Sequence, residues 1–304
     1  MLVFNKMLVM LLMLVVGVIC AKTGIVDKDA NKKLTTFALY VPQVCMILAS
    51  VMSDELSVTP LQILIILGCA CIMYALLVAL SFLVPHIYRC KPSDKGIYSF
   101  MTIFGNVGFM GFPVVQAIFG DAAVFYASIL NIPFNLLAYT LGVSLLNSKG
   151  KEVSFSWKLF VNPPLVASVV SILILLLRIP IPDFVASAVD SMGDMIVPLS
   201  MIIIGSSLGE QKLGEIFGDW RTYLFAPIRL IVSPILVWGV LHFIIKDELL
   251  LGTMTVLASM PVAAFATMLS IEYGGNEKVA SRTVFVSTVL SVLTIPFVCW
   301  LLPL

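Results

Sequence analysis

Charged residues are scarce in this 304-residue chain, where Asp, Glu, Lys and Arg together make up 12%. The formal net charge of +1 excludes the strongly basic composition of a nucleic-acid-binding protein. There are only two histidines, and the zinc-binding motif His-Glu-x-x-His is absent. The nucleotide-binding sequence Gly-x-x-x-x-Gly-Lys-Ser/Thr is also absent, which excludes a self-contained ATP-driven pump. The six cysteines lie mostly within apolar runs and at no spacing typical of a zinc or redox site, so we interpret them as small buried thiols and expect no metal and no cofactor.

Long apolar runs, in contrast, occupy most of the chain. Hydrophobic residues make up 60% of it and the mean hydropathy is +1.09, values typical of an integral membrane protein. Because about 20 apolar residues of helix cross a bilayer, these runs predict an all-α membrane protein with ten transmembrane helices. The predicted spans are 3–21, 34–53, 61–84, 98–119, 122–146, 159–178, 184–208, 222–245, 249–271 and 280–301. We interpret the first as a retained helix rather than a signal peptide, because positive charge follows it and no clear small-residue cleavage site is present.

The connections between the spans differ in positive charge. In the ten-span model, 14 of the 18 Lys and Arg residues belong to every second connection, so they lie on the same side of the membrane. Only Lys6, Arg178 and Lys246 lie on the other side, and Arg229 lies within a span. Cytoplasmic connections of membrane proteins carry the excess of Lys and Arg. The asymmetry therefore supports the ten spans and predicts a multi-pass protein of the cell (plasma) membrane with both termini extracytoplasmic.

Prolines at matching places indicate an internal repeat. Pro42 in the second span corresponds to Pro198 in the seventh, and Pro113 in the fourth span corresponds to Pro261 in the ninth. Each half then has five spans, and an odd number inverts the second half in the membrane, which is the inverted-repeat architecture of secondary transporters. The predicted division is a first repeat at 1–146, a short cytoplasmic link at 147–158 and a second repeat at 159–304.

The fourth and ninth spans are expected to be broken. A proline inside a helix removes a backbone hydrogen bond, and hydrocarbon tolerates this only where protein or a cavity satisfies the freed groups. Half-helix N-termini at a break present N–H groups suited to a carboxylate, while unwound carbonyls suit a cation. We predict that the breaks cross near the middle of the membrane, with Pro113 and Pro261 as N1 residues of the second half-helices. The alternative is that both prolines only kink packed helices.

Several short motifs surround these prolines. They are Gly105-Asn106 through Pro113 with Gly120-Asp121, Pro198-Leu199-Ser200 with Gly205 and Leu208, Arg229-Leu230 with Pro234, Met260-Pro261 followed by Tyr273-Gly274-Gly275, and an opening of Gly17, Asp27 and Pro42. With these motifs, over nearly its whole length, the chain resembles the auxin efflux carrier family of membrane transporters, which includes bacterial proteins named as malate or other organic-acid permeases.

This resemblance implies a ten-helix fold of two inverted five-helix repeats, related in architecture to the bile-acid sodium symporters. A scaffold part and a mobile part would alternate access around the crossed helices, and the family habit implies a homodimer. Plant members have a long cytoplasmic loop where this chain has only 147–158. In the family, polar residues beside the broken helices contact the substrate carboxylate, which implies that role for Asn106 and for the small residues around both prolines. The second half departs from the family pattern, because alanines at 263, 264 and 266 stand where some members have Asn, and Thr267 is the nearest hydroxyl.

Further polar residues lie within the predicted spans. Gln43 follows Pro42, Gln116 lies three residues beyond Pro113, and Asn131 and Asn135 are four apart in the fifth span, where amides either line a polar path or lock neighbouring helices together. The candidate substrate-binding residues are therefore Asn106, Gly108, Gly111, Pro113, Gln116, Asn131, Asn135, Pro261 and Thr267.

Three charged residues inside spans are candidates for coupling transport to an ion. Arg229 lies about 12 Å inside the eighth span, and Asp190 and Asp194 share one face of the seventh. An unpaired charge at such depth is expensive, so each should face a cavity or a partner. The carboxylates could bind sodium or a proton, or one of them could form a structural ion pair with Arg229.

A secondary active transporter of a small organic anion, a carboxylate such as malate, is the function that these features favour. A cell-negative potential favours export of the anion, and sodium- or proton-coupled import of organic acids is the alternative. An intramembrane enzyme is the alternative from another class, but it would need a nucleophile with a base or a metal cluster at depth, which the sequence does not indicate. The expected partners are the small organic anion, the lipid bilayer and a second copy of the chain, with no nucleic acid.

Overall fold

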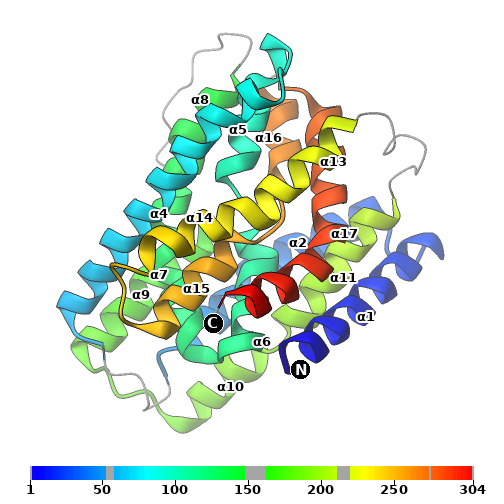
Figure 1. Cartoon of the computed structure of the whole chain (residues 1–304). Helices are drawn as coiled ribbons and strands as arrows, with labels where there is room; N and C mark the ends of the chain where they lie inside the picture. Colours follow the sequence, from blue (N-terminus) through cyan, green and yellow to red (C-terminus); the bar gives the residue numbers. More distant parts are fainter. Residues whose placement is uncertain (1, 53–57, 148–161, 211–219, 274, 303–304) are drawn as a thin grey trace. The chain divides into compact units, whose positions relative to one another are not determined.

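The computed structural model describes residues 2–52, 58–147, 162–210, 220–273 and 275–302. Regular structure in these ranges is helical and contains no strand, which confirms the predicted all-α class (Figure 1). The predicted link 147–158 lies outside the described residues except for Asn147.

Helices occupy each of the ten predicted ranges. In the first half of the chain they are α1 (Leu2–Lys22), α2 (Lys28–Tyr40), α3 (Pro42–Ala49), α4 (Pro60–Ile87), α5 (Lys95–Ile103), α6 (Phe112–Phe119), α7 (Asp121–Leu137) and α8 (Val143–Leu146). In the second half they are α9 (Pro163–Leu177), α10 (Asp183–Gly193), α11 (Ile196–Gly209), α13 (Trp220–Pro227), α14 (Ser233–Leu241), α15 (Glu248–Ala258), α16 (Phe265–Tyr273) and α17 (Glu277–Leu301). A 3₁₀ turn lies at Pro92–Asp94, and π-helical turns lie at Val107–Gly111, Ala138–Gly142 and Ile228–Val232.

Five helical segments of the described chain are long and apolar enough to cross a membrane. They are Pro60–Ile87, Asp121–Leu146, Asp183–Gly209, Trp220–Leu241 and Glu277–Leu301. Shorter apolar helices lie at Leu8–Lys22, Val107–Phe119, Pro163–Leu177 and Glu248–Ala258. Two of this second group, Val107–Phe119 and Glu248–Ala258, are too short to cross a bilayer because the predicted fourth and ninth spans are interrupted.

A proline lies at the interruption of the second predicted span but not at that of the seventh. Pro42 is the first residue of α3, and because proline has no N–H the α2 helix cannot continue through it. The seventh predicted span is interrupted at Asp194 and Met195 rather than at Pro198, which lies in the first turn of α11. A first turn accommodates proline, since its N–H groups have no partner within the helix.

Contacts between residues divide the chain into two compact units. Unit 1 comprises Met1–Leu67, Gly108–Ile132 and Val161–Gln211, and unit 2 comprises Gly68–Val107, Pro133–Phe160 and Lys212–Leu304. The predicted repeats are halves of the sequence, whereas each compact unit takes residues from both halves. The division into repeats therefore stays a prediction.

Unit 1 is built on two close helix contacts. Helices α1 and α11 run side by side (Figure 1), because Gly17 and Gly205 leave no side chain between the two backbones. The Ser206 hydroxyl donates a hydrogen bond of 3.0 Å to the Gly17 carbonyl across this contact. Helix α3 packs against α9 and α10, and the Ser171 hydroxyl donates to the Ile47 carbonyl at 3.1 Å.

Unit 2 has an aromatic core beside the ends of α5 and α16. The rings of Phe100 and Phe104 lie 4.7 Å apart between centroids, and Phe134 lies 5.6 Å from Phe104 and 5.9 Å from Phe265. Gly142 packs directly against the rings of Phe100 and Phe104, so a larger residue would displace them. This packing fixes the end of α5 and the start of α16 inside unit 2.

Candidate functional site

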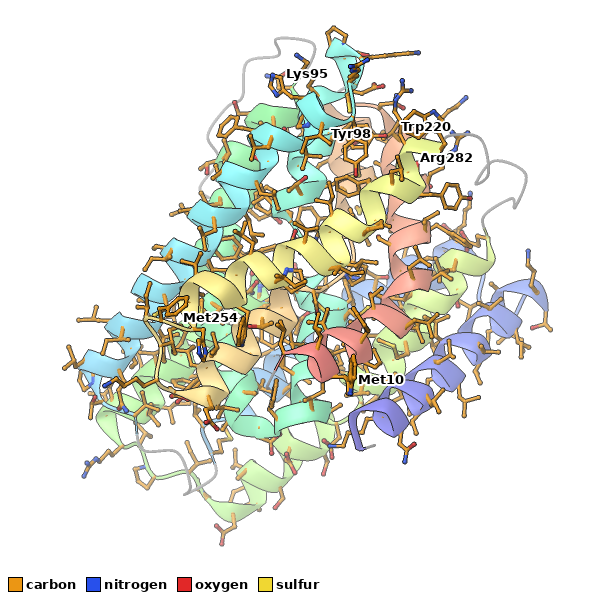
Figure 2. The ribbon with its side chains drawn as sticks, in the orientation of Figure 1. Met10, Lys95, Tyr98, Trp220, Met254 and Arg282 are labelled. Carbon is orange, nitrogen blue, oxygen red and sulfur yellow. The ribbon has the colours of Figure 1, made fainter. Side chains whose placement is uncertain are left out.

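Helices α5 and α15 both end inside unit 2, and the backbones that follow them pair with each other. Figure 2 shows Tyr98 on α5 and Met254 on α15, the two helices that lead into this pairing. Gly105 and Val262 form an isolated antiparallel bridge. The Asn106 N–H donates to the Pro261 carbonyl at 2.7 Å. The predicted breaks in the fourth and ninth spans are therefore present, and we call the paired backbones, Phe104–Asn106 and Pro261–Ala263, the crossing.

Further hydrogen bonds satisfy the backbone groups that the two broken helices release. The Ala263 N–H donates to the Phe104 carbonyl at 3.2 Å, and the Val262 N–H donates to the Ser287 hydroxyl of α17 at 3.1 Å. A buried backbone group without a partner costs about as much as a lost hydrogen bond. The crossing is thus stable in an apolar interior because protein groups replace the missing helical bonds.

Arg229 binds both ends of the crossing. It lies in the π-helical turn Ile228–Val232 and is 1% exposed. Its Nε donates to the Met260 carbonyl at 3.0 Å and its Nη1 donates to the Thr102 carbonyl at 2.8 Å. Its Nη2 occupies the place where a Cβ would stand on Gly105. The guanidinium therefore joins the chain after α15 to the C-terminal turn of α5.

Two groups at the crossing have hydrogen-bonding capacity left over. Asn106 is 6% exposed, and its side-chain amide forms no hydrogen bond within the described chain. The N–H groups of Ala264 and Phe265, at the start of α16, likewise form none there. Ala264 is exposed although its neighbours Ala263 and Ala266 are buried, so this helix start is open. Amide donors and a helix N-terminus are the groups that bind a carboxylate.

Comparison with known proteins shows to which protein family the chain belongs. A family model described as "Membrane transport protein" matches residues 2–156 and 152–299. The chain belongs to this family. It is the auxin efflux carrier-like family that the motifs predicted, so that resemblance is confirmed.

Similar proteins carry transporter names. An uncharacterised transporter of Methanocaldococcus jannaschii is 25% identical over 306 residues, covering 98% of both chains. An uncharacterised transporter of Methanothermobacter thermautotrophicus is 26% identical over 297 residues, covering 96% of both. A Rhizobium meliloti protein named "Putative malonate transporter" is 20% identical over 290 residues, covering 90% of this chain and 88% of that one. Together with its apolar helices, family membership makes this chain a multi-pass membrane transport protein.

In this membrane transport protein the predicted site residues fall in both units. Unit 2 brings Asn106, Pro261 and Arg229 together at the crossing, and Thr267 lies in the first turn of α16. Asn135 also belongs to unit 2 and is buried. The members in unit 1 are Gly108, Gly111, Pro113, Gln116, Asn131, Asp190 and Asp194.

In unit 1, two amides lie beside the second half of the broken fourth span. The Gln43 Nε2 donates to the Gly108 carbonyl at 3.4 Å, while the Gln43 Oε1 is buried with no partner among the described residues. Gln116 donates to Asp121 at 2.9 Å, across the turn that ends α6. Asn131 is buried on α7 and has a partner. Gln43, which the sequence places directly after Pro42, is therefore a further polar residue to consider.

The coupling candidates have different surroundings. Asp190 and Asp194 are exposed, one helical turn apart at the end of α10. Both hydrogen bonds of Arg229 go to backbone carbonyls of its own unit rather than to a carboxylate. Among the described residues no group of three or more His, Cys, Asp or Glu side chains could hold a metal ion.

The two prolines have different positions. Pro113 lies in the first turn of α6, as predicted for an N1-type residue, although the π-helical turn Val107–Gly111 leads directly into that helix. The same prediction for Pro261 is wrong, because Pro261 lies in the irregular segment 259–264 and α16 begins only at Phe265. Its carbonyl accepts the Asn106 N–H, so the segment is extended in order to pair with the other break.

Proposed function

We propose that the protein is a secondary active transporter that carries a small organic anion by alternating access. The observation that carries this proposal is the crossing, where two broken helices pair inside one unit, and where the Asn106 amide and the open start of α16 have no hydrogen-bond partner among the described residues. Interrupted helices in corresponding halves of a chain are the usual place of a transporter's binding site.

Ten transmembrane helices in two inverted five-helix repeats are part of this proposal. The composition of unit 1 supports it, since this unit combines α1–α3 with α9–α11, which occupy the first two spans of each predicted repeat. Repeat transporters achieve alternating access by rigid-body movement of one repeat or bundle, and we propose the same kind of movement here.

A carboxylate is the ligand class that fits the free groups. The Asn106 amide offers N–H donors, and the N–H groups of Ala264 and Phe265 add the partial positive charge of a helix start. Amides and a guanidinium bind anions and do not supply the nucleophile and base that an enzyme needs. The relative named for malonate supports a short dicarboxylate as the first compound to test.

The membrane potential favours efflux of an anion. Each negative charge that leaves a cell with a negative interior gains about 2.3 kcal/mol per 100 mV, so efflux needs no coupling ion. Import would need sodium or protons, for which Asp190 and Asp194 are the available carboxylates. We place the protein in the plasma membrane with both termini outside, on the asymmetry of its Lys and Arg residues.

Binding of radiolabelled malonate to the purified protein tests the proposal. It is measured by scintillation proximity with and without sodium, at two pH values, for the wild type, Asn106→Ala and Asn106→Asp. Asn5→Ala, a change at an exposed residue of α1, is the matched control. We expect saturable binding that Asn106→Ala weakens at least tenfold and Asn106→Asp weakens further through charge repulsion. Binding that both Asn106 variants retain at wild-type strength would place the site elsewhere.

The ion dependence of the same assay separates efflux from coupled import. Binding that needs neither sodium nor low pH supports uncoupled efflux of the anion. Binding that needs either of them supports the importer and directs attention to Asp190 and Asp194. If malonate does not bind, malate and longer dicarboxylates are compared in the same way.

A further inference from the structure

We infer that Arg229 is a positioning residue, which holds the crossing together and balances the negative ends of the two helices that meet there so that an anion can bind. The holding role, which keeps the crossing together, concerns the structure alone. The balancing role, which offsets the negative helix ends, rests on the proposed function because it concerns the affinity for a carboxylate.

The holding role follows from the positions of its acceptors. The Thr102 carbonyl belongs to the last turn of α5, and the Met260 carbonyl lies two residues beyond the end of α15. One rigid guanidinium donates to both, so the two chain segments keep a fixed spacing. Charge-assisted hydrogen bonds are roughly twice as strong as neutral ones, and Arg loses little freedom in forming two from its planar fork.

The balancing role follows from the helix dipoles. A helix C-terminus carries about half a negative charge, and α5 and α15 both direct their C-termini at Arg229. Together these ends amount to about one negative charge, which the single positive charge of Arg229 offsets. None of the described carboxylates forms an ion pair with the guanidinium, so the positive charge of Arg229 interacts with the two helix C-termini instead. Without it the crossing would repel an anion.

The local backbone is adapted to this arginine. The π-helical turn Ile228–Val232 places Arg229 at the crossing, and π-helical turns are common at functional sites. Gly105 has no side chain where the Arg229 Nη2 lies, so even a methyl group there would displace the guanidinium. The same contact can therefore be disturbed from either side.

The test uses variants that separate shape from charge. Arg229→Met keeps a long side chain without charge, and Arg229→Lys keeps the charge without the planar fork. Gly105→Ala displaces the guanidinium while leaving it in the chain. Gly239→Ala on α14 is the matched control, because no atom lies within 4 Å of a Cβ built there.

The first measurement is hydrogen exchange, which needs no ligand. In Arg229→Met and Gly105→Ala we expect the amides of Asn106 and Ala263, which pair across the crossing, to exchange at least tenfold faster than in the wild type. Gly239→Ala should leave them unchanged. Unchanged exchange in both crossing variants would overturn the holding role, whatever the substrate proves to be.

The second measurement is the affinity for three ligands of different charge: malonate, its monomethyl ester and malonamide. One unit charge at about 10 Å, in an effective dielectric constant of about 20, changes the affinity of a monoanion roughly tenfold. We therefore expect Arg229→Met to weaken malonate binding about a hundredfold and monoester binding about tenfold, to leave any malonamide binding unchanged, and Arg229→Lys to restore most of the loss. An equal loss for all ligands, or no loss, would overturn the balancing role.

A failure of the proposed function can be distinguished from a failure of the holding role of Arg229. If the wild type binds none of the anions tested, the affinity arm overturns the balancing role together with the substrate class, while the exchange arm still decides the holding role. If Arg229→Met cannot be purified, Arg229→Gln, which is also uncharged, replaces it in the affinity measurement, and Gly105→Ala supplies the exchange measurement.

Discussion

A methyl group added at Gly205 has no room in unit 1. A Cβ at this position would collide with the Leu14 carbonyl oxygen and lie 3.0 Å from the Gly17 Cα of α1. These are backbone atoms, so no side-chain rotation relieves the collision and α1 must move away from α11. Overpacking of this kind costs about 1–3 kcal/mol, and separation of the helices also weakens the bond from Ser206 to the Gly17 carbonyl, worth about 1 kcal/mol. We therefore expect Gly205→Ala to destabilise the protein by about 2–4 kcal/mol.

Thermal unfolding in detergent, followed with a thiol-reactive fluorescent dye, measures this effect. All six cysteines are thiols outside any disulfide, and Cys69 and Cys90 are buried, so unfolding exposes new thiols. A loss of 2–4 kcal/mol should lower the unfolding temperature on the order of 5–10 °C. Gly68→Ala is the control, because nothing lies within 4 Å of its Cβ, and its unfolding temperature should not fall. If Gly205→Ala unfolds at the temperature of the control, the close packing of α1 on α11 is refuted.

Three further predictions concern unit 2. Ser287→Ala removes the acceptor of the buried Val262 N–H and should cost about 1–3 kcal/mol in the same unfolding assay, whereas an unchanged unfolding temperature would mean that this N–H has another partner. Gly142→Leu would displace the rings of Phe100 and Phe104 and should prevent recovery of a monodisperse protein by size-exclusion chromatography, a prediction that a wild-type elution profile would contradict. Tyr88→Phe loses a hydrogen bond of 2.6 Å to the Leu224 carbonyl at an exposed edge and should cost only about 0.5–1.5 kcal/mol, so a larger loss of thermal stability would indicate a second role for the hydroxyl.

Hydropathy predicts the helical ranges of this protein well, because a bilayer restricts both the length and the composition of a helix that crosses it. The run 61–84 became α4 (Pro60–Ile87), and the run 280–301 became α17 (Glu277–Leu301). The breaks are harder to place. Pro113 lies in the first turn of α6 as predicted and Pro42 begins α3, while Pro261 lies in the extended pairing segment and the interruption near Pro198 precedes that proline.

The partners of Arg229 could not be predicted from the sequence. An arginine inside a span indicates that some partner must exist, and Asp190 and Asp194 were the conspicuous acidic candidates. The structure instead supplies backbone carbonyls, which every residue has and which no residue letter marks. Gly105 was the nearest available signal, since a glycine beside Asn106 leaves room for a large group.

The crossing also has a consequence for how the chain is made. Gly105 and Val262, which pair in it, are 157 residues apart, and both Arg229 and Ser287 also belong to the second half. A ribosome therefore delivers the broken fourth span to the membrane long before its hydrogen-bonding partners are synthesised. During that interval the exposed carbonyls of the first half need water, a lipid headgroup or an insertase to cover them. Biogenesis of this protein should accordingly depend on an assisting factor more than that of a protein whose membrane helices are all continuous.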